Sequence, residues 1–516
     1  MQTLQSYVQG RWHTGDGTPA VLVNPTTEEP LAECSSGGID FGQTLAYGRE
    51  TGGPALRALS FRERGELLKA LSAAIHEHRE ELIEVAVQNG GNTRGDAKFD
   101  LDGATGTLAA YAHFAKGLPD SPFLPDGDGV QLGRTARFWG QHVRVPRHGV
   151  ALHINAFNFP AWGMMEKAAC SLLAGVPVVE KPGTPTALVA WHIAKITVDS
   201  GLLPEGSYQF IAGSTGDSLD HLGIQDHLAF TGSSVTGAKL KGHPGLIQRN
   251  VRVNIEADSL NAAVLAPDID SSSETYGLFL SNVALDMTQK TGQKCTAVRR
   301  ILVPSDKVDQ VKEDLAAELG RIRVGDPSDK QNRMGPLSSA SQFADVRAGI
   351  DRLASVAETV CGGSEPIADK GFFLAPTLLV AKDAQTDAVH ADEVFGPVAT
   401  ILPYSGDAQE AAAIVRRGEG GLVSSAYSND ADWVRDYVAQ AGAWHGRIWI
   451  GSDKMAEQAL APGMVLPAMV HGGPGRAGGG EELGGLRGLE FYTQRVALQG
   501  FKGMIEGSFG QPGGAG

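Results

Sequence analysis

The chain has 516 residues, of which 42% are hydrophobic and 20% are charged, and its formal net charge at pH 7 is −15. This length and composition indicate a globular protein of several domains. The acidic balance argues against general nucleic-acid binding, because phosphates are met by clustered Lys and Arg side chains.

The cysteines and the N-terminus exclude further classes of protein. None of the four cysteines stands at C-x-x-C spacing, and no Cys/His cluster has zinc-ligand spacing, so we predict neither disulfides nor a metal site. The first residues lack the basic start and apolar run of a signal peptide. No apolar stretch reaches the ~20 residues that span a bilayer. We therefore expect a cytoplasmic protein with no membrane association.

In the first part of the chain the sequence predicts a loop and a helix. Turn-forming residues within 18–33 predict a surface loop. Residues 61–88 repeat apolar side chains at helical spacing, which predicts one long amphipathic helix that ends at the Asn-Gly-Gly-Asn run of residues 89–92. Residues 118–135 are rich in Pro, Gly and Asp and predict irregular structure.

From residue 136 onward, short apolar segments alternate with helical stretches, which predicts parallel sheets with crossover helices. The first series of strands is expected at 143–145, 150–154, 176–179, 209–212 and 227–230, with a helix at 167–173. A second series is expected at 262–265, 300–303 and 400–403. Residues 506–516 are mostly small and polar and are expected to be a disordered tail.

Two motifs at strand ends suit a dinucleotide. Residues 230–237 read FTGSSVTG after an apolar strand, and backbone N–H groups at such a helix start suit a pyrophosphate or a ribose. The spacing G-x-x-x-x-G leaves a plain glycine turn as an equal alternative. Lys181, in the segment VEKPGT at the end of a strand, could bind a ribose or a phosphate, or could be a surface lysine.

Three further residues are candidates for chemistry. Cys295, between small and polar residues, is a candidate nucleophile, although a lone Cys is more often a buried small residue. Glu256 ends an apolar strand, so it could be a base with a raised pKa, or a surface charge. Asn158, beside a strand end, could donate to a developing oxyanion or could belong to an ordinary turn.

Taken in this order, these five motifs resemble the aldehyde dehydrogenase superfamily. Further matches are GPL at 335–337, APTL at 375–378 and EVFGPV at 393–398, and the resemblance runs from about residue 7 to about residue 499. More closely, the sequence resembles the semialdehyde dehydrogenases of aerobic aromatic-ring degradation through CoA thioesters. These are the dehydrogenase half of the bifunctional ring-opening enzyme of phenylacetate degradation and a related enzyme of benzoate degradation.

Three segments carry the closer resemblance: NAFNFP at 155–160, EADSLN at 256–261 and HGGPGRAGGGEELGGLR at 471–487. The ordinary superfamily has two glycines just after the base, where this chain has Ala257 and Asp258. The glycine-rich segment near the end of this chain also differs from that of the ordinary superfamily. These departures mark the subgroup.

The resemblance implies a covalent mechanism. The Cys295 thiolate would attack the aldehyde, and the Asn158 amide together with the Cys295 backbone N–H would hold the oxyanion. Hydride would pass to the nicotinamide, and Glu256 would then activate the water that hydrolyses the thioester on Cys295.

The resemblance also implies a set of cofactor contacts. Glu393 would bind the nicotinamide ribose, Phe395 would hold the ring and Lys181 would bind the adenosine ribose. Lys167 matches a lysine near the family's site. The remaining implied contacts are Ala156, Phe157, Thr184, Gly213, Phe230, Gly232, Ser233 and Thr236.

Cofactor preference is predicted from one position. NAD-preferring relatives carry a Glu three positions after the Lys of the K-P motif, where it binds the ribose hydroxyls and would repel a 2′-phosphate. Here that position is Thr184, which is short and neutral. We therefore predict that NADP+ is preferred and that NAD+ is possible.

The resemblance also suggests a substrate. It favours oxidation of 3-oxo-5,6-dehydrosuberyl-CoA semialdehyde to its acid, in phenylacetate degradation. The alternatives are 3,4-dehydroadipyl-CoA semialdehyde, in benzoate degradation, and free aliphatic aldehydes. Because 516 residues leave no room for a fused hydratase domain, we expect a separate enoyl-CoA hydratase as a possible partner.

Two other activities remain as alternatives. A CoA-acylating enzyme would resolve the thioester with CoA, and Glu256, which would activate water instead, argues against it. A catalytically silent binding protein would not need Cys295, Glu256 and Asn158 together.

The implied fold is the α/β aldehyde dehydrogenase fold with three parts. A Rossmann-like cofactor domain is expected at 1–122 and 145–258, and an α/β catalytic domain at 259–465. A small β oligomerisation element is expected at 123–144 and 466–505. Alternating apolar residues around Val496 and Leu498 suit a strand that pairs across a homodimer or a larger homo-oligomer.

Overall fold

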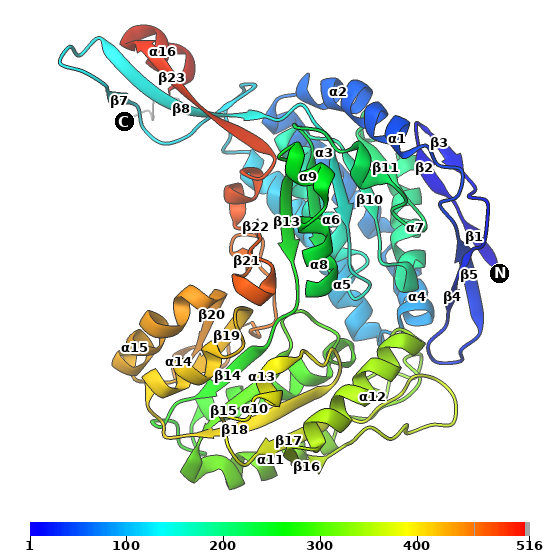
Figure 1. The fold of residues 1–516 in the computed structure, drawn as a ribbon, viewed down its shortest axis with the longest axis vertical. Helices are drawn as coiled ribbons and strands as arrows, with labels where there is room; N and C mark the ends of the chain where they lie inside the picture. Colours follow the sequence, from blue (N-terminus) through cyan, green and yellow to red (C-terminus); the bar gives the residue numbers. More distant parts are fainter. Residues whose placement is uncertain (459, 511–516) are drawn as a thin grey trace.

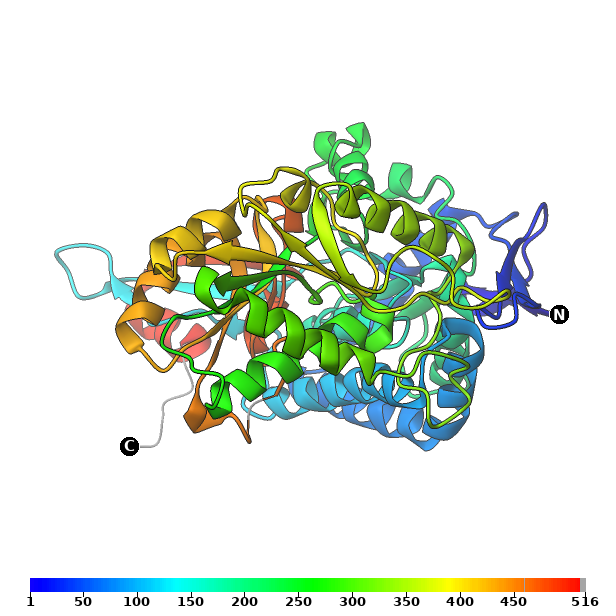
Figure 2. The same cartoon turned by 90° about the horizontal axis from the view of Figure 1, so that it is seen from below.

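The computed structural model describes residues 1–458 and 460–510. In these residues, two seven-stranded sheets covered by helices form the body, and a narrow β arm projects from it (Figure 1). The N-terminal strands lie at one end of the molecule and the arm at the opposite end, as both views show (Figures 1 and 2). No helix in the described part of the chain is both long and apolar enough to cross a membrane.

The first sheet, in the upper half of Figure 1, has the strand order β13-β12-β9-β10-β11-β2-β3. The five strands from β13 to β11 in this order are parallel, so that Leu152 of β9 lies between Val179 of β10 and Leu228 of β12. Their apolar residues are buried, as expected for a parallel sheet with helices on both faces. The bounds are β2 (Ser6–Val8), β3 (Arg11–His13), β9 (Ala151–Ile154), β10 (Val178–Lys181), β11 (Tyr208–Phe210), β12 (His227–Thr231) and β13 (Arg252–Glu256). The strands predicted at 150–154, 176–179, 209–212 and 227–230 are confirmed as parallel strands of this sheet. The strand predicted at 143–145 is part of Phe138–Pro146, which pairs antiparallel and lies outside this sheet.

Helices surround the first sheet. Helix α6 contains the predicted helix at 167–173 and ends where Gly175 takes a left-handed conformation, with φ 86°. The bounds are α1 (Phe41–Tyr47), α2 (Gly53–Arg57), α3 (Phe61–Glu77), α4 (Arg79–Gly90), α5 (Arg94–Ala115), α6 (Trp162–Ala174), α7 (Ala187–Asp199), α8 (Ser234–Lys241) and α9 (Pro244–Gln248). Apolar side chains of α3, α5, α6 and α7 form the largest buried cluster.

Two sequence predictions in the N-terminal region need correction. The single helix predicted at 61–88 is two helices, α3 and α4, because His78 leaves the helical conformation (φ −95°, ψ 13°) and Glu80 and Glu81 favour a new helix start. The loop predicted at 18–33 contains paired strands on either side of a turn, since Ala20–Val23 is an apolar run of strand-forming residues. The bounds are β1 (Gln2–Leu4), β4 (Ala20–Val23) and β5 (Pro30–Cys34).

The second sheet, in the lower half of Figure 1, has the order β16-β17-β18-β15-β14-β19-β20. All its pairs are parallel except β16 with β17. The three predicted strands of this region are confirmed as β14, β15 and β18. The strand bounds are β14 (Asn261–Leu265), β15 (Val298–Pro304), β16 (Ala357–Cys361), β17 (Thr377–Ala381), β18 (Val398–Tyr404), β19 (Gly421–Tyr427) and β20 (His445–Gly451). The helix bounds are α10 (Glu274–Thr288), α11 (Val308–Gly320), α12 (Ala340–Ala354), α13 (Ala388–Ala391), α14 (Ala408–Arg416) and α15 (Ala431–Ala441).

The arm joins two distant parts of the chain. β23 pairs antiparallel with β8 over their whole length, and the predicted strand around Val496 and Leu498 is confirmed. Residues 506–509, predicted to be disordered, are helical in α16, where Ile505 is buried and the Phe509 ring lies 5.0 Å from that of Phe123. Residues 511–516 of the predicted tail lie outside the described residues. The bounds are β6 (Leu124–Pro125), β7 (Val130–Gln131), β8 (Phe138–Pro146), β23 (Thr493–Phe501) and α16 (Lys502–Phe509).

Residues 466–492, which the sequence analysis placed in the oligomerisation element, lie with the body and not with the arm, and the bounds of that element stay a prediction. Their hairpin, β21 (Val470–Gly472) and β22 (Glu481–Leu483), packs against β20, β13 and α6 between the two sheets (Figure 1). Glycines permit this close packing, because a Cβ on Gly478 would lie 2.4 Å from the carbonyl oxygen of Ile255. The glycine-rich signature thus fits a segment inserted between the sheets.

Candidate active site

Cys295 lies in a segment whose backbone is held in an unusual conformation. Lys290, Thr291 and Gly292 all have positive φ, between α10 and β15. A Cβ on Gly292 would lie 2.2 Å from the carbonyl oxygen of Gly396, so this close approach requires glycine. The Asn261 amide donates to the carbonyl oxygens of Cys295 and Ala297, at 2.7 and 2.9 Å, and so fixes the segment to the second sheet.

Glu256 and Asn158 follow the parallel strands of the first sheet. Glu256 is the last residue of β13 and is 2% exposed, and Asn158 comes soon after β9. The Asn158 Nδ2 donates to the carbonyl oxygen of Gln293, at 3.1 Å, which brings the amide beside the Cys295 segment. The Thr231 hydroxyl, at the end of β12, donates to Glu256 Oε2 at 3.4 Å. The carboxyl ends of three parallel strands therefore meet at Cys295, as is usual for ligand sites in such sheets.

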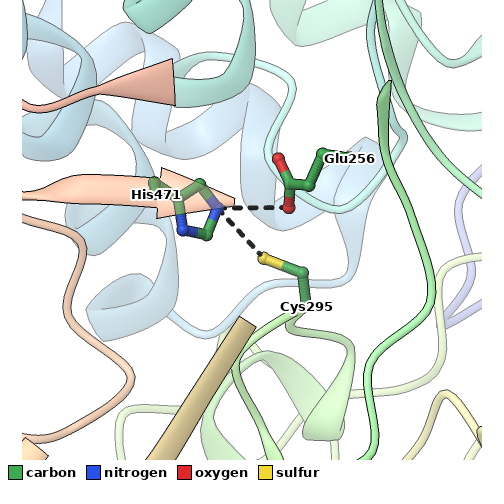
Figure 3. Close-up of side chains that lie close together, drawn as sticks. All are labelled: Glu256, Cys295 and His471. Atoms are coloured by element: carbon green, nitrogen blue, oxygen red, sulfur yellow. Dashed lines mark hydrogen bonds and ion pairs between the residues drawn. The ribbon is translucent and has the colours of Figure 1, made fainter. Parts of the chain in front are cut away.

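His471, to which the sequence analysis assigned no role, completes this group (Figure 3). Its Nε2 lies 3.8 Å from Cys295 Sγ and 3.1 Å from Glu256 Oε1. The three side chains line one cavity of about 40 Å³. His471 stands at the start of the glycine-rich signature, and that position was the only signal for it in the sequence.

The electrostatics of the three groups are coupled. Burial and the Glu256 charge raise the pKa of the Cys295 thiol well above its usual value. Burial alone would also raise the pKa of Glu256, but the charges of His471 and Lys167 lower it. The raised pKa expected for Glu256 from its place on an apolar strand is therefore wrong, because basic side chains reach it. Burial opposes protonation of His471, but Glu256 raises the pKa of its imidazole above the usual value.

A second buried group of charges lies behind Glu256. Lys167 Nζ lies 3.2 Å from Glu482 Oε2 and 3.6 Å from Glu166 Oε1. Asn254 donates to the other oxygen of Glu482, at 3.1 Å. Burial raises the pKa of Glu166 to about 8, so this carboxyl is protonated near neutral pH and the Lys167 charge is matched by Glu482. Lys167 therefore lies near the site, as the resemblance implied.

A cleft of about 1090 Å³ contains most of the predicted cofactor contacts. Cys295 and Glu256 line both this cleft and the smaller cavity, so the two spaces meet at the reactive side chains. Other predicted residues on the cleft wall are Ala156, Phe157, Asn158, Lys181, Phe230, Gly232, Ser233, Thr236, Glu393 and Phe395.

Several features of this cleft fit a nicotinamide dinucleotide. The ammonium of Lys181, at the end of β10, makes no hydrogen bond or ion pair within the part of the chain that the structure describes, so it is available to a ribose or a phosphate. The Phe395 and Phe157 rings lie edge to face, 5.9 Å apart. Glu393 accepts from the Arg299 guanidinium and the Ser259 backbone N–H, and burial raises its pKa to about 7.

Asp258 has a local structural role at the start of α8. Its carboxylate accepts from the Ser234 backbone N–H at 2.9 Å and from the Ser234 hydroxyl at 2.5 Å. This residue, one of the two that replace the glycines of the ordinary superfamily, thus ties the base segment to the helix on the cleft wall.

Two predicted cofactor residues do not line the cleft. Thr184 lies in a short helical turn between the lining residues Gly183 and Pro185. Gly213 lies outside the cleft, with φ 130°, and a Cβ there would be 2.6 Å from the Ser36 backbone nitrogen. This glycine permits close packing against the N-terminal segment, and the contact of Gly213 with the cofactor stays a prediction.

The sequence was compared with protein families and with known proteins. The profile described as "Aldehyde dehydrogenase family" matches residues 12–497. The chain is 42% identical to the 3,4-dehydroadipyl-CoA semialdehyde dehydrogenase of Aromatoleum evansii, over 91% of this chain and 93% of that protein.

Two solved structures show the likeness of fold. The NAD+ complex of an aldehyde dehydrogenase from Bacillus cereus has a TM-score of 0.84 at 22% identity and covers 97% of each chain. An NADP-dependent enzyme of E. coli has a TM-score of 0.84 at 24% identity and covers 96% of this chain and 98% of that chain. The fold implied by the sequence is confirmed.

Proposed function

Because the chain belongs to the aldehyde dehydrogenase family, and is thus an oxidoreductase acting on aldehydes, we propose that it oxidises the aldehyde end of a CoA-linked semialdehyde to a carboxylic acid. We propose NADP+ as the preferred acceptor, with NAD+ as possible. The observation that carries the proposal is that Cys295 and Glu256 lie where a small cavity meets a dinucleotide-sized cleft.

In the proposed mechanism, Cys295 Sγ attacks the aldehyde carbon from the junction of the two spaces. The Asn158 amide, already held beside the Cys295 segment, donates to the oxyanion that forms. The bound nicotinamide supplies the hydride acceptor, with Glu393 and Phe395 on the wall that would hold it. A thioester on Cys295 results.

Hydrolysis of this thioester is assigned to Glu256. Its lowered pKa keeps the carboxylate ionised at neutral pH, ready to take a proton from water. His471 lies within 3.8 Å of Sγ and 3.1 Å of the carboxylate, so it is placed to hold a proton between the two. This arrangement favours water over CoA as the group that accepts the acyl chain.

The substrate proposal rests on the relative described above that has the highest identity to this chain. The 42% identical relative acts, by its name, on 3,4-dehydroadipyl-CoA semialdehyde, and we propose this compound first. The phenylacetate-branch compound, which the sequence resemblance favoured, is the second candidate, since the glycine-rich segment at 471–487 resembles both branches. Phe99, Phe159 and Trp162 on the cavity wall suit the carbon chain next to the aldehyde.

The test is reduction of NADP+ or NAD+ by the purified protein with three aldehydes. These are the two CoA semialdehydes, generated in place, and a free aliphatic aldehyde of similar length, with Cys295→Ala as the blank. We expect kcat/KM to be highest for 3,4-dehydroadipyl-CoA semialdehyde. A higher value for the dehydrosuberyl compound would move the protein to the phenylacetate branch, and a higher value for the free aldehyde would reject the CoA assignment.

The proposal also covers the location of the protein, its assembly and one partner. We propose a cytoplasmic homodimer or larger homo-oligomer assembled through the arm, and a separate enoyl-CoA hydratase as a partner. A pull-down from cells grown on the aromatic acid should recover a hydratase, and recovery of none would count against that partner.

A further inference from the structure

The side chains of Glu256, Cys295 and His471 have a second capacity, as a metal-ion site. We propose that the protein without substrate binds one Zn²⁺ ion between these three side chains, and that this ion reversibly blocks the enzyme. One carboxylate oxygen, one thiol sulfur and one imidazole nitrogen all lie within 4.8 Å of one another. Carboxylate, thiolate and imidazole are the ligands that zinc prefers in proteins.

The spacing of the three atoms fits tetrahedral coordination. With Zn–S near 2.3 Å and Zn–N and Zn–O near 2.0 Å, ligand atoms stand roughly 3.5 Å (S to N) and 3.3 Å (N to O) apart. In the protein the Sγ to Nε2 distance is 3.8 Å and the Nε2 to Oε1 distance is 3.1 Å. These two distances are thus within a few tenths of an ångström of the values for one shared ion, and the third pair, Sγ and the carboxylate oxygen, lies within 4.8 Å.

An independent observation concerns the Glu256 carboxylate. Among the described residues, its Oε1 is buried without a hydrogen-bond partner, although His471 Nε2 lies only 3.1 Å away. The two groups are close but not aligned as donor and acceptor, and Cys295 Sγ lies on the same side of the imidazole nitrogen as the carboxylate (Figure 3). A buried oxygen without a partner is costly, and a cation in this position would satisfy it.

The small cavity leaves a fourth coordination position open. All three side chains line it, together with apolar groups such as Phe99 and Trp162. A water molecule in the cavity can complete the tetrahedron, as in zinc sites with three protein ligands. The ion would hold Sγ as a thiolate, with its proton released to solvent, and would hold the carboxylate of Glu256. Neither group could then act on an aldehyde.

The sequence could not indicate this site. Its ligands come from the end of β13, from the segment before β15 and from β21, so no short spacing motif contains two of them. The sequence analysis predicted no metal site because it searched only for ligands at short spacing along the chain.

Cobalt(II) titration of the full chain tests the proposal directly, because a thiolate bound to Co²⁺ gives a charge-transfer absorption that oxygen and nitrogen ligands do not. We expect one Co²⁺ per chain with this absorption and displacement of the Co²⁺ by Zn²⁺. Cys295→Ser should abolish the absorption, and His471→Ala should weaken Co²⁺ binding at least tenfold.

Matched controls address other metal-binding groups on the chain. Cys361→Ser removes another partly exposed thiol, and His78→Ala removes an exposed imidazole beside Glu81. Both should bind Co²⁺ as the unmodified protein does. Because His471 is buried, His471→Gln is measured as well, with circular dichroism as the check that both variants fold.

Three results would overturn the proposal: no Co²⁺ bound, an absorption that survives Cys295→Ser, or an affinity unchanged in a folded His471 variant. Binding is measured without aldehyde or nicotinamide, so its outcome does not depend on the proposed substrate. In the activity assay, Zn²⁺ should inhibit and EDTA should restore the full rate, and inhibition that EDTA cannot reverse would contradict a reversible block.

Discussion

At the scale of single residues, the nucleophile is in an environment that opposes its ionisation. Burial, together with the nearby charge of Glu256, raises the pKa of the Cys295 thiol. The thiol is therefore protonated at neutral pH before ligands bind, and its proton must leave when Sγ attacks. Glu256 and His471 are the groups placed to accept it.

This environment predicts the effect of removing one charge. Glu256→Gln deletes the negative charge next to Sγ, so the pKa of the Cys295 thiol should fall. The pH at which iodoacetamide alkylates Cys295 at half its maximal rate, followed by peptide mass spectrometry, should move to lower pH. The exposed carboxylate variant Glu313→Gln should leave the profile unchanged. A profile that stays in place or moves to higher pH in Glu256→Gln would show that this carboxylate does not control the thiol.

At the scale of elements, the short turn after β10 is expected to select the cofactor. Thr184 stands in this turn, between two residues of the cleft wall and three positions after Lys181. Thr184→Glu would place a negative charge where the 2′-phosphate of NADP+ is expected, so the ratio of kcat/KM for NADP+ to that for NAD+ should fall at least ~10-fold. Thr27→Glu, an exposed change of the same kind outside the cleft, should leave this ratio unchanged. An unaltered ratio in Thr184→Glu would reject the assignment.

The elements also show what could be predicted from the sequence. The strands predicted in the two sheets, among them β9, β12, β14, β15 and β18, were found because each is a short apolar run with buried side chains. The other strands of the second sheet, β16, β17, β19 and β20, were not predicted. The break at His78 was missed, because apolar spacing continues across it and only the local conformation changes. β4 and β5 were missed because turn residues between them dominated the pattern.

The candidate site was predicted in part from the sequence. Cys295, Glu256 and Asn158 stand in motifs that resemble a family, and the fold brings them together. His471 was missed because its role depends on a glycine-rich hairpin inserted between the sheets, and glycines signal flexibility without showing where the chain goes. Gly213 was assigned to the cofactor because a glycine after a strand can serve a ligand or packing, and the sequence does not distinguish these.

At the scale of the whole molecule, the arm projects from the body (Figure 1). Apolar side chains on it face solvent, among them Val496, Phe501 and Met504 at 36%, 61% and 65% exposure. A projecting ribbon of this kind is marginal alone, which is why we propose that a second copy of the chain covers it.

Charges on this arm should therefore disrupt assembly. The double variant Val496→Asp and Phe501→Asp should raise the dimer dissociation constant at least ~100-fold, as measured by sedimentation velocity. Ile224→Asp, a similar change on the body at a residue that is 68% exposed, should leave assembly intact. A double variant that assembles as the unmodified protein does would place the interface elsewhere.

The active site itself is a property of the whole molecule, since the first sheet, the segment before the second sheet and the hairpin between them each supply one of its three side chains (Figure 3). In the proposed mechanism, Cys295 carries the acyl group and Glu256 is the base for its hydrolysis. Glu256→Gln should separate the two steps, because it keeps the nucleophile and removes the base, and its steady-state kcat should fall by about 10²-fold or more.

The most direct measurement is rapid acid quench of Glu256→Gln after mixing with the CoA semialdehyde and NADP+, followed by mass spectrometry of the peptide that contains Cys295. We predict a burst of one equivalent of NADPH and the acyl mass on Cys295, and neither the burst nor the acyl mass in Cys295→Ala. No burst, or an acyl group on another residue, would contradict it.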